Sequence, residues 1–261
     1  MERRLIDGLP FGLPEEIYAA LRGGAVYDSS CSPEARVYYI ERDGGYFLKL
    51  AARGTLAREA EMTGYFHSLG LGAEVLHYSR GERDILLTAR VAGEDMTDPR
   101  YLAEPRRLAV LLGESLRALH EVNPAGCPVT DRVGEYLALA DRNFDTGCYD
   151  KSHFPDSFGY RSEAEARAVL DAGRHLLCNE VLIHGDYCLP NIMLDGWRLS
   201  GFIDLGNAGV GDRHIDLFWG AWTLGFNLHT DAYRDLFFDA YGRDKIDTDK
   251  LAVVAAAEVF G

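Results

Sequence analysis

The sequence lacks long apolar runs and paired cysteine motifs. A helix that crosses a membrane needs about 20 consecutive apolar residues, and no segment of this chain supplies them. The N-terminus carries arginines but neither the apolar core nor the small-residue cleavage site of a secretory signal. The five cysteines are widely spaced and form no C-x-x-C pair, so neither a zinc site nor a redox couple is indicated. We expect a cytoplasmic protein with reduced thiols and no membrane contact.

Glycine-rich phosphate loops and an excess of positive charge are also missing. Neither G-x-x-x-x-G-K-[ST] nor G-x-G-x-x-G occurs, so the chain has no Walker or Rossmann phosphate cradle. Acidic residues outnumber basic ones by 41 to 27, for a formal net charge of -14. This charge repels nucleic acid and anionic lipid. It is compatible with solubility alone or with a cationic small-molecule partner, and nothing indicates an obligate protein partner.

What the sequence does contain is the composition of an ordinary globular protein, 47% hydrophobic and 26% charged. Residues 25–88 hold short β runs, AVYD, ARVYYI, YFLKL, EVLHYS and DILLT, with a D-G-G turn between the second and third. Helical spacing of apolar residues predicts one helix at 56–69. This part of the chain therefore predicts an antiparallel sheet with one helix.

The pattern changes to helices after residues 89–93. An apolar stripe predicts a helix over PRRLAVLLGESLRALHEV, and further helices are expected at 132–142 and 163–178. Short β runs (VLIH, NIML and LSGFID) follow up to residue 204, and the remaining chain is expected to be helical. We predict an α+β fold with a β-rich N-terminal lobe at 1–88, a hinge linker at 89–93 and a mainly helical C-terminal lobe at 94–261.

Three oxygen-bearing side chains follow the predicted strands of the second lobe. Asp186 and Asn191 lie five positions apart in H-G-D-Y-C-L-P-N, and Asp204 follows the next hairpin in I-D-L-G. Phosphoryl transfer from a nucleotide requires a carboxylate near the attacking hydroxyl and hard oxygen ligands for Mg²⁺. Asp and Asn in loops also cap turns, but this spacing favours a phosphotransfer site. Two Asp, one Asn and no clustered His disfavour a zinc hydrolase.

These motifs resemble those of known kinases. Asp-x4-Asn followed by a strand-borne Asp-x-Gly is similar to the catalytic loop and metal-binding Asp of protein kinases. The spelling H-G-D resembles the aminoglycoside phosphotransferases, and GFIDLGNAGVGDRHIDL resembles their 3'-phosphotransferase branch. The similarity extends from CSPEARVY to AEVF. It implies a two-lobed protein-kinase-like fold, ATP (with GTP left open) and Mg²⁺ as cofactors, and a polycationic small-molecule substrate.

The resemblance also assigns roles to single residues. Asp186 would accept the proton of the substrate hydroxyl, while Asn191 and Asp204 would hold Mg²⁺. Lys49 on the strand YFLKL would pair with Glu59 on the following helix and grip the nucleotide phosphates, with Glu61 as an alternative partner. His184, Asp212 and Asp216 would brace the catalytic loop. The remaining nucleotide contacts implied are Ser32, Phe47, Ala89, Val91 and Ile203.

Several carboxylates are needed to bind a polycation. The resemblance points to the long loop after the second C-lobe helix and to the end of the chain, giving as substrate-binding candidates Asp150, Asp156, Glu258 and Phe260. The sequence departs from the family at Asn207, Asn227 and Ala257, where an Arg and two acids are usual.

The leading hypothesis is ATP-dependent phosphorylation of an aminoglycoside at its 3'-hydroxyl, which confers resistance. One alternative keeps the kinase chemistry but changes the acceptor to another cationic or hydroxylated small molecule. A second alternative is a nucleotide-binding pseudokinase, which the intact Lys49, Asp186, Asn191 and Asp204 disfavour.

Overall fold

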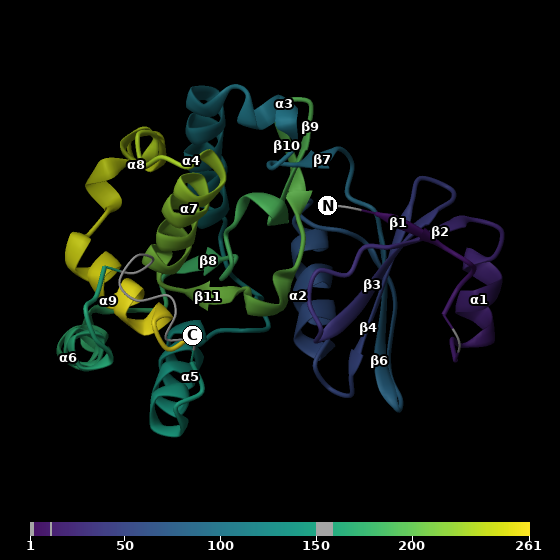
Figure 1. Cartoon of the computed structure of the whole chain (residues 1–261), viewed down its shortest axis with the longest axis horizontal. Helices are drawn as coiled ribbons and strands as arrows, with labels where there is room; N and C mark the ends of the chain where they lie inside the picture. The colour runs from purple at the N-terminus through teal and green to yellow at the C-terminus, as the bar shows by residue number, and fades with distance from the viewer. Residues whose placement is uncertain (1–2, 11, 150–158) are drawn as a thin grey trace. The chain divides into compact units, whose positions relative to one another are not determined.

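The computed structural model describes residues 3–10, 12–149 and 159–261 (Figure 1). The chain forms two compact units. The first unit comprises Met1–Glu94 and Met193–Gly206, and the second comprises Asp95–Ile192 and Asn207–Gly261. The first unit thus takes in a segment from late in the sequence, which the predicted boundaries had placed in the second lobe. The assignment of 1–88, 89–93 and 94–261 as lobes and hinge stays a prediction.

A six-stranded antiparallel sheet forms the centre of the first unit (Figure 1). Its strand order is β1-β2-β3-β4-β6-β5. The predicted antiparallel sheet is confirmed, and the D-G-G turn joins β3 to β4 with positive φ at all three of its residues. The strands are β1 (Arg4–Ile6), β2 (Ala25–Asp28), β3 (Ala35–Glu41), β4 (Tyr46–Ala52), β5 (Val75–Arg80) and β6 (Arg83–Ala89).

The two faces of this sheet pack against different helices. Successive side chains of a strand point to opposite faces, so Leu48 and Leu50 join the cluster around α1 (Glu15–Leu21). Ala51 instead joins the cluster around α2 (Ala57–Ser68). The helix predicted at 56–69 is therefore confirmed, whereas β1 and α1 were not predicted. Lys49 has the same parity as Ala51, which places it on the α2 face.

The late segment of the first unit is a β-hairpin. It is formed by β9 (Ile192–Asp195) and β10 (Arg198–Phe202), and the backbone N–H of Phe202 donates to the carbonyl of Leu71 at 2.8 Å. The fully buried Phe202 ring packs edge-on against Phe66 of α2, with 6.1 Å between centroids. These contacts attach the segment that leads to Asp204 to the end of α2. The short β7 (Glu94–Asp95) lies at the boundary of the units.

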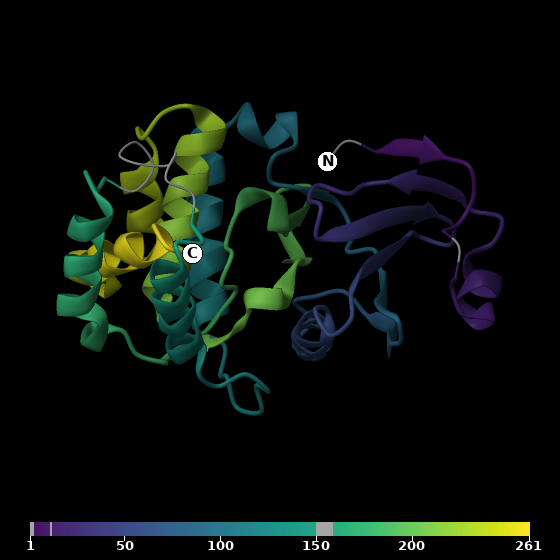
Figure 2. The ribbon, with the colours of Figure 1, turned by 60° about the horizontal axis from the view of Figure 1, so that its bottom comes forward.

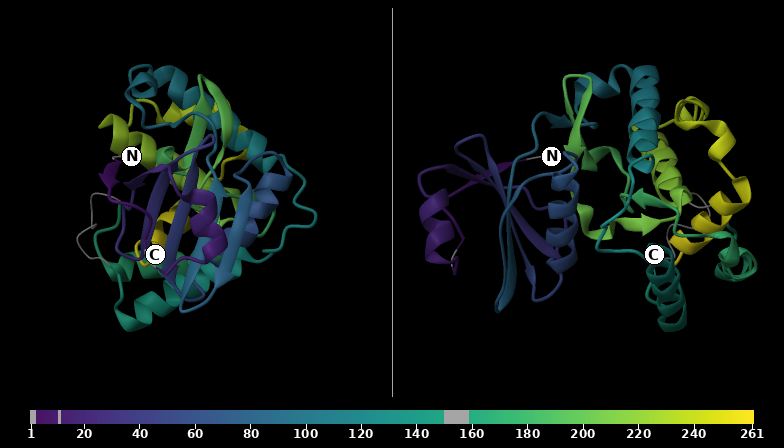
Figure 3. Two further views of the ribbon diagram at one scale, coloured as in Figure 1. Left: turned by 90° about the vertical axis from the view of Figure 1, so that its right-hand side faces the viewer. Right: turned by 180° about the vertical axis from the view of Figure 1, so that it is seen from behind.

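The second unit is mainly helical, as predicted. Helix α4 lies side by side with α7 and α8 (Figure 3), and α6 packs against α9 (Figure 2). Its helices are α3 (Pro99–Leu102), α4 (Pro105–His120), α5 (Arg132–Thr146), α6 (Glu163–Gly173), α7 (Arg213–Leu228), α8 (Arg234–Tyr241) and α9 (Thr248–Glu258). Four 3-10 turns complete the described elements, η2 (Arg174–Leu176), η3 (Leu189–Asn191), η4 (Leu205–Asn207) and η5 (Arg243–Lys245).

Two predictions for the second half of the chain were wrong. The helix expected at 163–178 ends at Gly173, a residue of low helix propensity, after which the backbone tightens into the 3-10 turn η2 and becomes extended at Leu177. The region after residue 204 is not entirely helical, since β11 (Gly209–Gly211) pairs antiparallel with β8 (Val181–Ile183). Within the described ranges, no helix combines the length and apolar character needed to cross a membrane.

Candidate functional site

In the first unit, one ammonium group bridges two carboxylates. The Nζ atom of Lys49 donates to Glu59 at 2.7 Å and to Asp204 at 3.0 Å. The alternation of side chains along β4 places Lys49 on the face of the sheet that packs against α2, and Glu59 lies in the first turn of that helix. Asp204 lies two residues after the end of the β9–β10 hairpin. The predicted pairing of Lys49 with Glu59 is confirmed, while Glu61 is exposed.

The side chains of this cluster differ in burial, and burial shifts the pKa values of Lys49 and Glu59. Burial acts to lower the pKa of Lys49, but the carboxylates of Glu59 and Asp204 outweigh it and raise the pKa. Burial also raises the pKa of Glu59, against the attraction of Lys49. The Asp204 side chain is 53% exposed, compared with 13% for Glu59. One cation between two carboxylates leaves a net negative charge, and Asp204 is the oxygen ligand that remains open to a further cation.

The backbone of Asp204 is held in a rare conformation. Its φ is +59°, in the left-handed region that residues with a Cβ seldom adopt. Such a conformation costs on the order of 1–3 kcal/mol and persists where the surroundings enforce it. The neighbours that anchor it are Phe202 and Leu205, both fully buried. The strain supports a role for this carboxylate in function.

In the second unit, Asn191 fixes the carboxylate of Asp186. The Nδ2 atom of Asn191 donates to the carbonyl of Asp186 at 3.0 Å and to its Oδ2 at 2.9 Å. Asn191 ends η3, whose start is held because the N–H of Leu189 donates to the hydroxyl of Thr223 at 3.2 Å. Asn191 is buried, and among the described residues its Oδ1 accepts no hydrogen bond. That amide oxygen is therefore available as a hard ligand for Mg²⁺.

The fully buried Asp216 braces the loop before Asp186. Its two oxygens accept the backbone N–H groups of His184 and Gly185, each at 2.7 Å. Gly185 has φ +81°, and a Cβ there would lie 2.1 Å from the carbonyl oxygen of Asn207. The bracing role predicted for Asp216 is confirmed. Asp212 has a different role, because it caps α7 instead.

The predicted nucleotide contacts of the first unit have varied surroundings. Ser32 is exposed between β2 and β3, and its hydrogen bond to Glu34 lowers the pKa of that carboxyl. The Phe47 ring packs against Tyr39 with 5.3 Å between centroids. The N–H of Ala89 already donates to Glu74 at 2.9 Å. Val91 is buried, and Ile203 is partly buried beside Asp204.

Glu258 is a partly buried carboxylate in the second unit. Its Oε1 accepts from the hydroxyl of Tyr136 at 2.8 Å and from the indole N–H of Trp219 at 3.0 Å. Burial raises the pKa of Glu258 to about 7, these two hydrogen bonds oppose the increase, and the charge of Asp186 adds to it. Sequence reasoning missed Tyr136 and Trp219, because nothing in a sequence shows which helices meet around a carboxylate.

The other predicted substrate residues contribute less. Phe260 is fully buried between Phe144 and Tyr149, so its ring offers no surface to a ligand and anchors the segment that carries Glu258. Asp150 and Asp156 lie outside the described residues.

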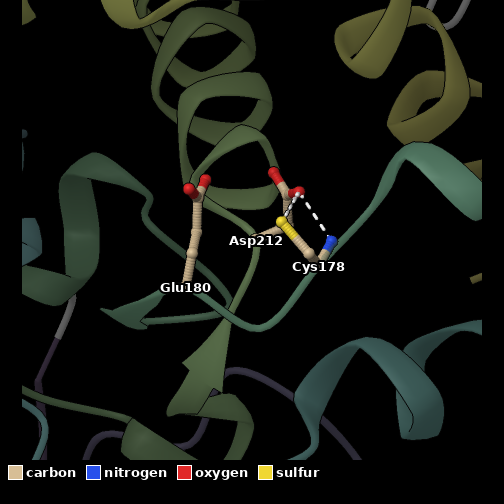
Figure 4. A group of neighbouring side chains, drawn as sticks. All are labelled: Cys178, Glu180 and Asp212. Carbon is tan, nitrogen blue, oxygen red and sulfur yellow. Dashed lines mark hydrogen bonds between the residues drawn. The ribbon is translucent and has the colours of Figure 1, made fainter.

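A further group of potential metal ligands is formed by Cys178, Glu180 and Asp212, whose ligand atoms lie within 4.8 Å of one another (Figure 4). The chain's own cations already engage this group. Lys250 donates to Asp212 at 2.9 Å, and Arg213 donates to Glu180 at 2.7 Å. We therefore assign these side chains to the packing around the start of α7. No disulfide links the five cysteines, all of which lie in the described ranges.

The chain is similar to several aminoglycoside phosphotransferases. A probable aminoglycoside 3'-phosphotransferase of Lactococcus lactis subsp. lactis (strain IL1403) is 49% identical over 249 residues, which is 95% of each protein. The crystal structure of an aminoglycoside-3'-phosphotransferase of type VIII has a TM-score of 0.77 and 25% identity, and the match covers 94% of this chain and 97% of that one. APH(3'')-Id from Streptomyces rimosus, solved with ADP and streptomycin, has a TM-score of 0.69 and 24% identity over 87% of this chain and 91% of that one.

These similarities confirm the predicted α+β fold of the protein-kinase-like type. A sequence model described as the phosphotransferase enzyme family matches residues 33–254. That range includes Lys49, Glu59, Asp186, Asn191 and Asp204, the residues of the two hydrogen-bonded groups described above. The chain belongs to the phosphotransferase enzyme family.

Proposed function

We propose that the chain transfers the γ-phosphoryl group of ATP to the 3'-hydroxyl of an aminoglycoside and thereby confers resistance. The observation that carries the phosphotransfer proposal is the bridging of Glu59 and Asp204 by Lys49. The acceptor is proposed from the 49% identity to a probable aminoglycoside 3'-phosphotransferase. The net charge of -14 agrees with a polycationic acceptor.

The first unit is proposed to bind the nucleotide. Lys49, held by Glu59, is positioned to pair with its phosphates, as a lysine on the equivalent strand does in kinases. Phe47 and Ile203 would contact the base, Ser32 would cover the phosphates, and the backbone at Ala89 and Val91 would meet the base edge. Because the N–H of Ala89 is already bonded to Glu74, its carbonyl is the group left for this contact. In this proposal residues 1–88 form the nucleotide lobe, 89–93 the hinge and 94–261 the acceptor lobe.

Asp186 is proposed as the catalytic base. Asn191 fixes one of its oxygens, so the other can orient the acceptor hydroxyl and accept its proton. The Oδ1 of Asn191 and the exposed carboxylate of Asp204 would hold Mg²⁺, and their donor type suits that ion. When bound, Mg²⁺ would neutralise charge on the nucleotide phosphates. The side chains of this chain supply the rest, namely phosphate binding by Lys49 and proton transfer by Asp186.

The test is a panel of aminoglycosides incubated with ATP and Mg²⁺, with ADP release and product mass as readouts. Kanamycin B and its 3'-deoxy analogue form a matched pair, since only the first offers the 3'-hydroxyl. We expect phosphorylation of kanamycin B and none of the analogue, and none of either by Asp186→Asn. Absence of any phosphorylated aminoglycoside would refute the proposed acceptor, and equal phosphorylation of the pair would refute the 3' position.

The departures at Asn207, Asn227 and Ala257 favour a second candidate, a kinase of another cationic or hydroxylated small molecule. Asn227 turns its amide back to Thr223 and adds no charge to the second unit. A broad acceptor screen that follows ADP release separates the two candidates.

A further inference from the structure

A row of aromatic side chains runs along α7, and its first member contacts Glu258 of α9. We call Trp219, Trp222 and Phe226 the aromatic row. Trp219 donates its indole N–H to Glu258 and meets Trp222 edge-on, with 5.4 Å between centroids. Trp222 and Phe226 are stacked at 5.0 Å with 12° between their planes. The spacings of three and four residues place all three rings on one side of the helix.

The outer end of the aromatic row is not explained by core packing. Trp219 packs against the hydrophobic core of the second unit, which is the usual reason for such a stripe. Phe226, however, is 62% exposed, and Trp222 is only partly buried. Large aromatic rings that stack in solvent give up the stabilisation available from burial. The exposed Phe226 ring, stacked on the partly buried Trp222, is therefore a candidate binding surface.

The aromatic row starts at the residues assigned to the acceptor. Thr223, next to Trp222, accepts the N–H of Leu189 in the loop that carries Asp186. Glu258 is close enough to Asp186 for the charge of one to affect the other. Helix α7 therefore holds the catalytic loop on one side and presents the aromatic row on an adjacent side.

Few carboxylates of the described residues lie near the aromatic row, so a cation that binds there would depend on the aromatic rings. Helix α7 has no acidic residue after Asp216. Both hydrogen bonds to Glu258 fall on Oε1, and within the described part of the chain Oε2 accepts none. A cationic ligand would thus meet one carboxylate oxygen at Trp219, the ring that contacts Trp222. Aromatic faces attract ammonium groups within about 6 Å of their centroids.

We propose that Trp222 and Phe226 bind an amino-sugar ring of the acceptor, with one ammonium group against a ring face and another at Oε2 of Glu258. This inference rests on the proposed function and adds specificity-determining residues to it. Trp219 acts as a positioning residue, because it connects the stacked rings to Glu258.

Substitutions at Trp222 test the proposal. Trp222→Ala and Trp222→Leu should raise the KM for kanamycin roughly 3- to 30-fold, the range expected when a cation–π contact is lost. The kcat and the KM for ATP should be unchanged, because such a contact is equal in the ground state and the transition state. Trp222→Phe should retain most of the affinity. Leu5→Ala is the control, since Leu5 is 66% exposed, as Phe226 is at 62%, but belongs to β1 of the first unit.

Intrinsic fluorescence gives a second readout that does not need turnover. The chain has three tryptophans, and Trp219 still contacts Glu258 in Trp222→Phe, so kanamycin should change the emission of the wild type more than that of Trp222→Phe. If Trp222→Ala does not fold, Phe226→Ala at the exposed end of the row takes its place, with the same expected rise in KM.

The outcomes separate this inference from the proposed function. Phosphorylation with an unchanged kanamycin KM in Trp222→Ala or Phe226→Ala would overturn the inference and leave the function intact. Equal KM values for Trp222→Leu and Trp222→Phe would overturn the role of the ring face. If the wild type phosphorylates no aminoglycoside, the proposed function is wrong. A kanamycin-dependent fluorescence change that is smaller in Trp222→Phe than in the wild type would still support the inference, whereas equal changes in both proteins, or no change, would refute it.

Discussion

Lys49 and Asp204 are 155 positions apart in the sequence, yet the Nζ atom of one lies 3.0 Å from an oxygen of the other. The contact joins the central sheet of the first unit to a hairpin from late in the chain. Since Lys49 is the one cation between two carboxylates, its removal changes both nucleotide binding and the balance of charge.

Lys49→Ala should raise the KM for ATP roughly 10- to 100-fold, the effect expected when a charged hydrogen bond to a ligand is lost. It removes the charge that opposes the effect of burial on Glu59, so the pKa of Glu59 should rise further. Nucleotide titration by calorimetry measures the first effect. Lys245→Ala is a matched control at an exposed ion pair with Glu121; an equal loss of ATP affinity in both variants would contradict the role of Lys49.

Asp186→Asn should reduce kcat on the order of 10²- to 10⁴-fold, because an amide cannot accept the hydroxyl proton. The KM for ATP should stay near its wild-type value, since Asp186 belongs to the second unit and Lys49 to the first. Steady-state kinetics measure both constants. Asp235→Asn, at an exposed position of α8, controls for loss of charge. Turnover unchanged by Asp186→Asn would remove Asp186 from the mechanism.

Gly185→Ala should destabilise the catalytic loop. The new Cβ would need a left-handed backbone and would lie 2.1 Å from the carbonyl oxygen of Asn207. Gly196→Ala is the matched control, because Gly196 also has a positive φ, +55°, but no atom within 4 Å. Strain alone costs on the order of 1 kcal/mol, so the urea midpoint of Gly185→Ala should fall well below that of Gly196→Ala. Similar midpoints would contradict this prediction, because they would show that the catalytic loop accommodates the contact with Asn207 without a loss of stability.

Glu258→Gln should change how stability depends on pH. Burial raises the pKa of Glu258 from 4.5 to about 7, so the folded protein binds more protons than the unfolded chain between these values. The contribution of Glu258 to stability is full below about pH 4.5 and is lost as the pH rises to about 7. The neighbouring Tyr136 stays protonated, because burial and Glu258 hold its pKa well above 10.

Urea unfolding of the wild type and Glu258→Gln at pH 5 and pH 8 measures this effect. The variant keeps a neutral side chain at both pH values, so its stability relative to the wild type should increase with pH. The KM for kanamycin should also rise in the variant at pH 8, where the wild-type carboxylate is ionised. Parallel stability curves would contradict the raised pKa.

The sequence predicts local structure well where its pattern is strong. The run YFLKL was predicted as a strand, and the structure places it in β4. Helix α1 was missed because it has seven residues and follows Pro14, whose side chain makes no capping hydrogen bond. The strand β11 was missed because G-V-G has a low strand propensity. Its partner β8 is also distant in the sequence, since Gly209 pairs with Ile183 and Gly211 with Val181.

In the candidate site, too, residues in local motifs were predicted, whereas residues brought together by tertiary packing were not. Asp186, Asn191 and Asp204 were predicted from motif spacing, and the pairing of Glu59 with Lys49 from the resemblance to kinases. Tyr136 and Trp219 could not be predicted, because their contacts with Glu258 depend on how α5, α7 and α9 pack together. Phe260 was expected at a ligand surface, but tertiary packing buries it.

Because the β9–β10 hairpin belongs mostly to the first unit, that unit is discontinuous in the sequence, which limits how the gene can be cut into fragments that fold. The chain passes between the two units at residues 94–95, 192–193 and 206–207. A gene fragment that stops after codon 94 would encode the sheet with Lys49 but not Asp204, and the complementary fragment would carry Asp204 without its partner strand. No single cut yields both units whole. One crossover between relatives therefore cannot exchange either unit as a whole.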